Sequence, residues 1–239
     1  MKAKVIFSIV VVAVLSAGNN TSANNTQEND FHRIRLGVTF SPAYSYRTLK
    51  GSDIHGMLNS RNDYEIAKFG YSGGLNIDYN LKSWFGIESG ILYTNKGYRT
   101  KKTYLSYDDP VIGNSQWIRT TYSYHYIDIP LKIRFSAGWE KIRFSAAAGI
   151  TTGFLAGQTN TLQFENGRDK SPNYASDYNR VNLFPTISAG MDYKVTSKST
   201  LRLEPVFQYG LVKTSKSEGP ISDYLWSVGV NVSYLIGIK

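Results

Sequence analysis

The chain has 239 residues, with 27 Lys and Arg against 18 Asp and Glu, and a formal net charge of +9. The absence of Cys excludes disulfide bonds and thiolate catalysis, and the even spread of basic residues argues against nucleic-acid binding. The 18 Tyr and 21 Gly indicate strands, because both residues rank below Ala, Leu and Glu in helix propensity.

The first segment of the chain has the pattern of a secretory signal peptide. Lys2 and Lys4 precede an apolar run over residues 5–15, and small residues follow from Ser16. A run of about eleven apolar residues is too short to span a membrane as a helix. We expect cleavage near residue 17 or 23. Residues 1–23 then contain the signal peptide and the start of a polar lead-in, 24–32 form a flexible lead-in, and 33–239 form the exported domain.

After residue 33, apolar residues alternate with small or polar residues in eight segments. These segments are 34–44, 69–79, 85–94, 127–135, 142–154, 181–193, 201–211 and 226–236. A period of two predicts strands with two different faces. Each segment reaches the roughly 9–11 residues that a tilted strand needs to cross an outer membrane.

The connections between these segments alternate in length. The short ones are 81–84, 137–140 and 195–199, and the long ones are 47–68, 96–119, 157–180 and 213–223. Outer-membrane barrels have short periplasmic turns and long extracellular loops, whereas a soluble β-sandwich has no reason to place its long connections at one end. The sequence therefore predicts an all-β fold, an eight-stranded antiparallel up-and-down transmembrane β-barrel.

Aromatic residues fall near both ends of the predicted strands, as in the two girdles of membrane barrels. The expected outer girdle is Tyr44, Tyr71, Tyr93, Tyr124, Phe154 and Tyr209, and the expected inner girdle is Tyr79, Trp84, Phe135, Trp139, Tyr193 and Tyr234. We therefore expect a monomer in the bacterial outer membrane, with membrane lipid and lipopolysaccharide as partners.

The positions between the apolar ones face the lumen of this barrel and are mostly Gly, Ser, Thr and Asn. The charged residues among them are Arg35, Asp78, Glu88, Asp128, Lys132, Arg134, Arg143, Asp192, Arg202 and Glu204. Most of these charged residues fall in the periplasmic half of the lumen. We therefore expect Gly, Ser and Thr to line the extracellular half, which we call the upper lumen.

Unpaired charges are costly in a narrow interior, which predicts a salt-bridged plug rather than a conducting pore. The expected partners of Glu88 and Glu204 are among Arg134, Arg143 and Arg202. The alternative is a water-filled lumen in which each charge is hydrated separately.

Residues 124–135 read Tyr-His-Tyr-Ile-Asp-Ile-Pro-Leu-Lys-Ile-Arg-Phe. This segment resembles the hallmark strand of the PorT-like outer-membrane β-barrel family of Gram-negative bacteria. The resemblance is carried by Ile127, Asp128, Ile129, Pro130 and Leu131, with weaker similarities at 73–76 and 188–193. It implies an outer-membrane barrel. Because the family takes its name from a component of a protein-secretion system, it also implies envelope or secretion proteins as partners.

Two patterns that could carry chemistry have simpler explanations. Residues 70–74 match the Gly-x-Ser-x-Gly motif, but they lie within a predicted strand and not at the strand-to-helix turn that exposes a nucleophilic Ser. His32, His55 and His125 lack the spacing of metal ligands. We expect no catalytic, cofactor-binding or metal-binding residue and no cofactor.

The leading functional hypothesis is a non-enzymatic outer-membrane protein, structural or interaction-mediating through its extracellular loops. A second is an accessory component of a protein-secretion system. A third is a barrel enzyme that hydrolyses lipid or peptide and uses His125 near Asp128.

Overall fold

The structure is a computed structural model, which describes residues 31–53, 56–105, 116–165, 167–173, 177–216 and 219–238. Antiparallel strands account for most of these residues. In the described ranges, no helix has the length and apolar character to cross a membrane. The expected signal peptide and most of the expected lead-in lie outside the described residues.

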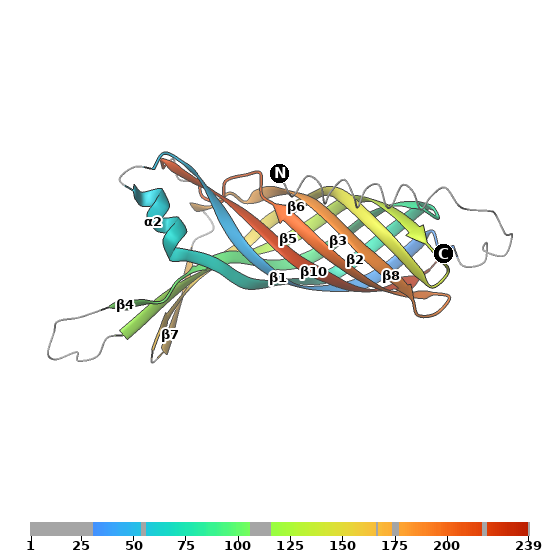
Figure 1. Cartoon of the computed structure of the whole chain (residues 1–239), viewed down its shortest axis with the longest axis horizontal. Coiled ribbons are helices and arrows are strands. Elements are labelled where there is room, and N and C mark those ends of the chain that lie inside the picture. Colours follow the sequence, from blue (N-terminus) through green and yellow to red (C-terminus); the bar gives the residue numbers. More distant parts are fainter. Residues whose placement is uncertain are drawn as a thin grey trace.

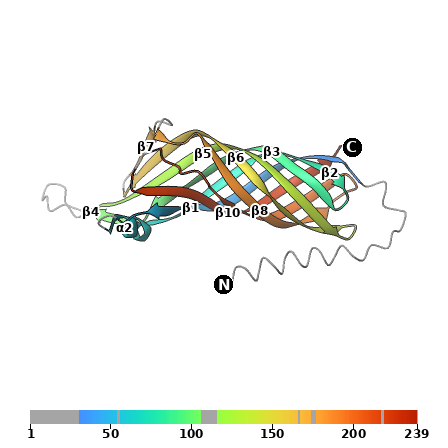
Figure 2. The same cartoon turned by 90° about the horizontal axis from the view of Figure 1, so that it is seen from above.

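Eight antiparallel strands close a ring. Figures 1 and 2 show the resulting barrel from two sides. In ring order the strands are β1 (Ile34–Gly51), β2 (Glu65–Lys82), β3 (Phe85–Thr100), β5 (Gln116–Gly138), β6 (Ile142–Phe164), β8 (Val181–Lys194), β9 (Ser199–Tyr209) and β10 (Ile221–Gly237). The ring closes because β10 pairs with β1 along the whole length of both strands. The predicted eight-stranded antiparallel barrel is confirmed.

The wall of the barrel is apolar outside and polar inside. Leu75, Ile91 and Leu131 are among the many exposed apolar side chains, whereas charged side chains such as Asp78 and Arg202 are buried. This distribution is the reverse of that in a water-soluble β protein. It follows from the period of two, since successive side chains of a strand point to opposite faces.

The short connections lie at one end of the barrel and the long ones at the other. Residues 83–84, 139–141 and 195–198 make the three short connections. We call their end the turn end and the opposite end the loop end. The helix α2 (Met57–Tyr64) joins β1 to β2 at the loop end (Figure 1). The predicted alternation of short and long connections is confirmed.

The strands at the loop end continue into segments that the sequence pattern assigned to loops. β5 and β6 have 23 residues each, and their ends pair with β4 (Thr103–Leu105) and β7 (Gly167–Asn173). We call β4, β7 and the paired ends of β5 and β6 the projecting sheet (Figure 1). The expected loops at 96–119 and 157–180 are therefore partly wrong. Beyond the lipid the outer face of a strand no longer needs apolar side chains, so the apolar alternation stops while the backbone pairing continues.

The closed ring generates a prediction about gel mobility. Every strand of the ring pairs with two neighbours, so SDS finds no free edge at which to begin unfolding. We expect the unheated protein to migrate at a different apparent mass from the boiled protein. Identical mobility before and after boiling would contradict a closed barrel.

Candidate functional site in the barrel lumen

The inward positions near the turn end bring eight charged side chains together. They are Arg35, Asp78, Glu88, Lys132, Arg134, Asp192, Arg202 and Glu204, which we call the charged layer. Four are cations and four are carboxylates, so the formal charges of the layer cancel. The strand register sets this arrangement, since it places Asp78 opposite Glu88 and Asp192 opposite Arg202.

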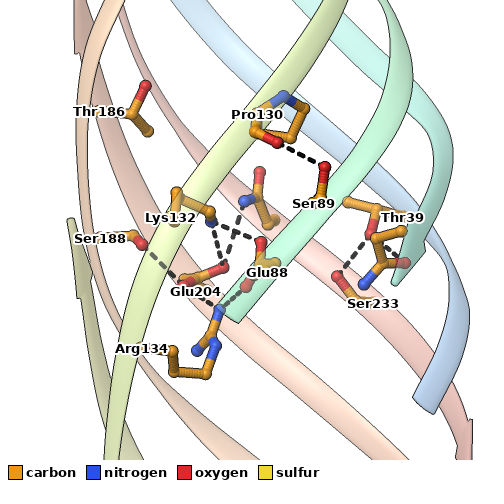
Figure 3. Close-up of polar contacts among 12 residues, drawn as sticks. Thr39, Glu88, Ser89, Pro130, Lys132, Arg134, Thr186, Ser188, Glu204 and Ser233 are labelled. Atoms are coloured by element: carbon orange, nitrogen blue, oxygen red, sulfur yellow. Dashed lines mark hydrogen bonds and ion pairs between the residues drawn. The ribbon is translucent and has the colours of Figure 1, made fainter. Parts of the chain in front are cut away.

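Glu88 has three cationic partners. Its Oε1 lies 2.6 Å from Lys132 Nζ, and its Oε2 accepts hydrogen bonds from Arg134 and, at 3.2 Å, from Arg202. Glu204 accepts a second bond from Arg134 at 2.8 Å. Figure 3 shows Glu88, Lys132, Arg134 and Glu204 pointing toward one another from β3, β5 and β9. The two carboxylates thus share their cations.

Arg202 links the other half of the layer. Its Nε donates to Asp192 Oδ1 at 2.7 Å, and its Nη2 donates to Asp78 Oδ2 at 2.8 Å. Arg35 also contacts both aspartates, at 2.8 Å from Asp78 and 3.4 Å from Asp192. A guanidinium is suited to this position because its planar fork can serve two carboxylates at once.

Two residues from the expected charge network lie outside the charged layer. The expected pairing of Arg143 with Glu88 or Glu204 does not form. Arg143 lies at the start of β6, half-buried, and donates instead to the carbonyl of Ser83 in the adjacent turn. Asp128 lies nearer the loop end and pairs with Lys96 at 3.0 Å.

The segment that resembles the PorT-like family forms the middle of β5. Ile127, Ile129 and Leu131 are exposed on the outer wall, whereas Asp128 and Pro130 are buried on the inner one. The carbonyl of Pro130 accepts a hydrogen bond from the Ser89 hydroxyl at 2.8 Å. Residues 124–135 thus contribute lipid-facing side chains and the three luminal charges Asp128, Lys132 and Arg134.

The expectation of Gly, Ser and Thr in the upper lumen is correct only in part. Ser45, Thr151 and Thr186 line the lumen beside the charged layer, but such residues do not fill the part nearer the loop end. A cluster of large side chains fills it: Tyr98, Tyr124, Tyr126, Leu155, Phe184 and Leu225, which we call the aromatic layer. Tyr124, expected in the outer girdle, belongs to this layer because it shares the inner face of β5 with Tyr126. The remaining girdle residues are exposed or half-exposed.

Ion pairs that the sequence analysis missed accompany the aromatic layer. Lys96 Nζ, paired with Asp128, lies 3.7 Å from the centre of the Phe184 ring. Arg47 pairs with Glu65, and its guanidinium carbon lies 3.9 Å above the centre of the Tyr98 ring. Arg47, Glu65, Lys96 and Tyr98 lie in segments that the sequence pattern assigned to loops. The signal that could have found Lys96 is the alternation of Thr94, Lys96 and Tyr98, which continues past the apolar part of β3.

A polar cavity of about 50 Å³ lies between the charged layer and the aromatic layer. Hydroxyl and amide groups line its wall, among them those of Thr39, Asn76, Thr151, Thr186, Gln208 and Ser233. Glu88 and Lys132 border it on one side, and Lys96 and Asp128 border it on the other. One water needs roughly 10–15 Å³ of such space, so a few waters fit.

The chain matches the protein family described as outer membrane protein beta-barrel domain over residues 18–216. A comparison with curated proteins found no match. Among solved structures, it is similar to the outer membrane protease OmpT of Escherichia coli, with 9% identity, coverage of 92% of this chain and 99% of that chain, and a TM-score of 0.43. The outer membrane protein OprG of Pseudomonas aeruginosa has 10% identity, coverage of 87% and 99%, and a TM-score of 0.42. Neisserial surface protein A has 12% identity, coverage of 83% and 96%, and a TM-score of 0.38.

The shared cations of Glu88 generate a prediction about stability. Glu88→Gln removes one negative charge and leaves the charged layer with an excess of positive charge in a buried place. Breaking a buried ion pair costs about 3–5 kcal/mol, so the temperature at which the gel shift occurs should fall clearly. Glu140→Gln, in the exposed turn between β5 and β6, is the control and should leave that temperature unchanged. Equal temperatures for the two variants would mean that water hydrates the luminal charges separately.

Proposed function

Because the chain belongs to the outer membrane protein β-barrel domain family, we propose that it is a non-enzymatic barrel with a closed lumen that acts through contacts made at its loop end. The family and the fold place the protein in the bacterial outer membrane. The proposal concerns what it does there, and it depends on whether the lumen can carry solutes.

The observation that carries the proposal is the obstruction of the lumen at two levels. Near the turn end, each carboxylate of the charged layer contacts two or three cations, so no member can move aside without losing several partners. Nearer the loop end, Tyr126 and Phe184 are fully buried and their rings pack edge to face at 5.8 Å. An eight-stranded barrel has room for such side chains but not for a channel beside them. A protein of this kind exerts its function from its ends.

The loop end is the better candidate for contacts with partners. The turn end has three short connections, whereas the loop end has α2 and the projecting sheet. Long connections of outer-membrane barrels are extracellular, so we place the loop end outside the cell. There, structural or interaction-mediating contacts with envelope components would be made.

The middle segment of β5 favours a second candidate function, an accessory role in protein secretion. Its residues Ile127–Leu131 are those that resemble the PorT-like family. In this setting the exposed Ile127, Ile129 and Leu131 would offer an apolar outer wall to a membrane-embedded partner. Recovery of secretion proteins after crosslinking at this wall would distinguish the second candidate from the first.

A barrel hydrolase would depend on His125, and its surroundings favour another role. His125 Nδ1 lies 2.6 Å from the hydroxyl of Tyr93 and 3.2 Å from Asn95 Nδ2. A general base must reach the proton that it removes, and a Ser, Thr or water would be the usual nucleophile. The Thr159 hydroxyl lies 3.4 Å from His125 Nε2, but Asp128, which would orient the ring, is buried in the lumen and pairs with Lys96. This separation supports a structural role for His125 at the outer wall.

The obstruction generates a prediction about conductance. Purified protein in planar lipid bilayers should show no stable open channel, because both layers block the lumen. The double variant Tyr126→Ala and Phe184→Ala removes side chains from the aromatic layer only, so it should also stay closed as long as the charged layer is intact. Steady conductance of the wild-type protein would refute the closed lumen.

The orientation can be tested by labelling, which the absence of Cys makes simple. Asn62→Cys places a single thiol on the exposed α2, and Lys198→Cys places one in the exposed β8–β9 turn. A membrane-impermeant maleimide added to whole cells should label the first variant and spare the second. The opposite result would mean that the loop end faces the periplasm.

A further inference from the structure

The outer wall of the barrel changes character along β3, β5 and β6. Tyr93, Ile127 and Phe154 lie opposite one another in the sheet register and are 39%, 36% and 43% exposed. Residues directly opposite on neighbouring strands share one face of a sheet. This row therefore marks the lipid-facing side of the wall at its upper boundary.

Toward the loop end, the same face becomes basic and hydrogen-bonding. Its successive register rows are Asn95, His125 and Gly157; Gly97, Ser123 and Thr159; Arg99, Thr121 and Thr161; and Arg119, Gln163 and Arg168. We call these four rows the basic face. They contain three Arg and a His but no Asp or Glu, and the residues that alternate with them, such as Tyr98 and Tyr124, are buried in the lumen.

Three cations on or beside the basic face, Lys68, Arg99 and Arg119, meet no carboxylate among the residues that the structure describes. Lys68 is only 5% exposed, and its Nζ donates to two neutral groups of this face, the side-chain oxygen of Asn95 and, at 2.9 Å, the hydroxyl of Ser123. Within the described ranges, Lys68, Arg99 and Arg119 form no ion pair. The Nε atoms of Arg99 and Arg119 are buried and without a hydrogen-bond partner. A partly buried cation without a carboxylate is unfavourable unless an anion reaches it from outside.

The position of the basic face identifies the anion. The face continues the lipid-facing wall directly beyond Tyr93, so the groups beside it are lipid headgroups. In the orientation proposed above, these headgroups belong to the outer leaflet, whose lipopolysaccharide carries phosphates on sugars. Arg binds phosphate through a planar fork of donors, and the hydroxyls of Thr121 and Thr161 can bond to sugars.

We propose that the basic face binds the phosphorylated sugars of the lipid A part of lipopolysaccharide, with Arg99 and Arg119 as the phosphate ligands. Lys68 adds a positive charge at the edge of the site nearest the membrane, and the exposed Arg168 extends the site onto β7. The inference rests on the proposed orientation but not on the closed lumen.

The proposal is tested by binding of purified lipid A to the full chain refolded in detergent. The double variant Arg99→Gln and Arg119→Gln should raise the dissociation constant at least tenfold, since it removes both phosphate ligands. Lys82→Gln with Lys141→Gln removes two exposed charges at the turn end and should leave the affinity as in the wild-type protein. The heat-dependent gel shift verifies that each variant is folded. If the double variant does not fold, Arg168→Gln, at an exposed site outside the barrel ring, should still weaken binding.

Three outcomes would overturn the proposal. One is wild-type affinity in the double variant. Another is equal affinity for lipid A from which the phosphates have been removed, because sugar or acyl contacts would then suffice. The third is equally tight, competing binding of heparin, which would make the basic face a general polyanion surface. The cysteine labelling described above shows separately whether the orientation is at fault.

Discussion

The structure depends on the neutralisation of charge in a space that holds little water. An eight-stranded barrel encloses room for side chains only, so a charge buried on an inward position is costly unless it meets an opposite charge on another strand. Arg202 illustrates this requirement, because it lies on β9 and meets Asp78 of β2 and Asp192 of β8. The members of the charged layer come from six strands, β1, β2, β3, β5, β8 and β9, so these contacts require that the six strands be in register. The charged layer therefore ties the closure of the ring to a single arrangement of strands, and a slip of one residue would turn these charges toward lipid.

The aromatic layer closes the other half of the lumen by a different means. Tyr98, Tyr126 and Phe184 pack as a small hydrophobic core, and the nearby cations Arg47 and Lys96 lie over the rings while keeping a carboxylate partner. Aromatic side chains bury a large area and fill volume, and a cation over a ring adds an electrostatic attraction. The polar cavity remains where neither kind of layer reaches. A lumen closed by two unlike layers supports a function exerted at the ends of the barrel and not through it.

The outer wall repeats this division between environments. Along β5, one face carries Leu131 and Ile127 where lipid surrounds the barrel, and Ser123 and Arg119 where it does not. The strand continues without interruption, so the change is one of side chains and not of backbone. The boundary between the two parts is where apolar contact with lipid gives way to charge and hydrogen bonding. At this boundary, the phosphates of a lipid headgroup would neutralise the positive charge and its sugars would accept and donate hydrogen bonds. This match is the physical basis of the inferred lipid A site.

The sequence by itself determined the barrel, the number of its membrane strands and the end at which its long connections lie. Those features follow from local patterns, since lipid contact imposes an apolar residue at every second position of a strand. It also identified Glu88, Arg134, Arg202 and Glu204 as luminal charges and predicted their pairing, but it missed Lys132 as a shared partner of both glutamates. The extension of the strands beyond the lipid, the luminal place of Tyr124 and the roles of Lys96 and Arg47 were decided only by the tertiary structure. Beyond the membrane the apolar alternation ends, so no apolar pattern indicates that the strands continue. Inside the lumen the contacts join residues of different strands, so they leave no pattern in neighbouring positions of the chain.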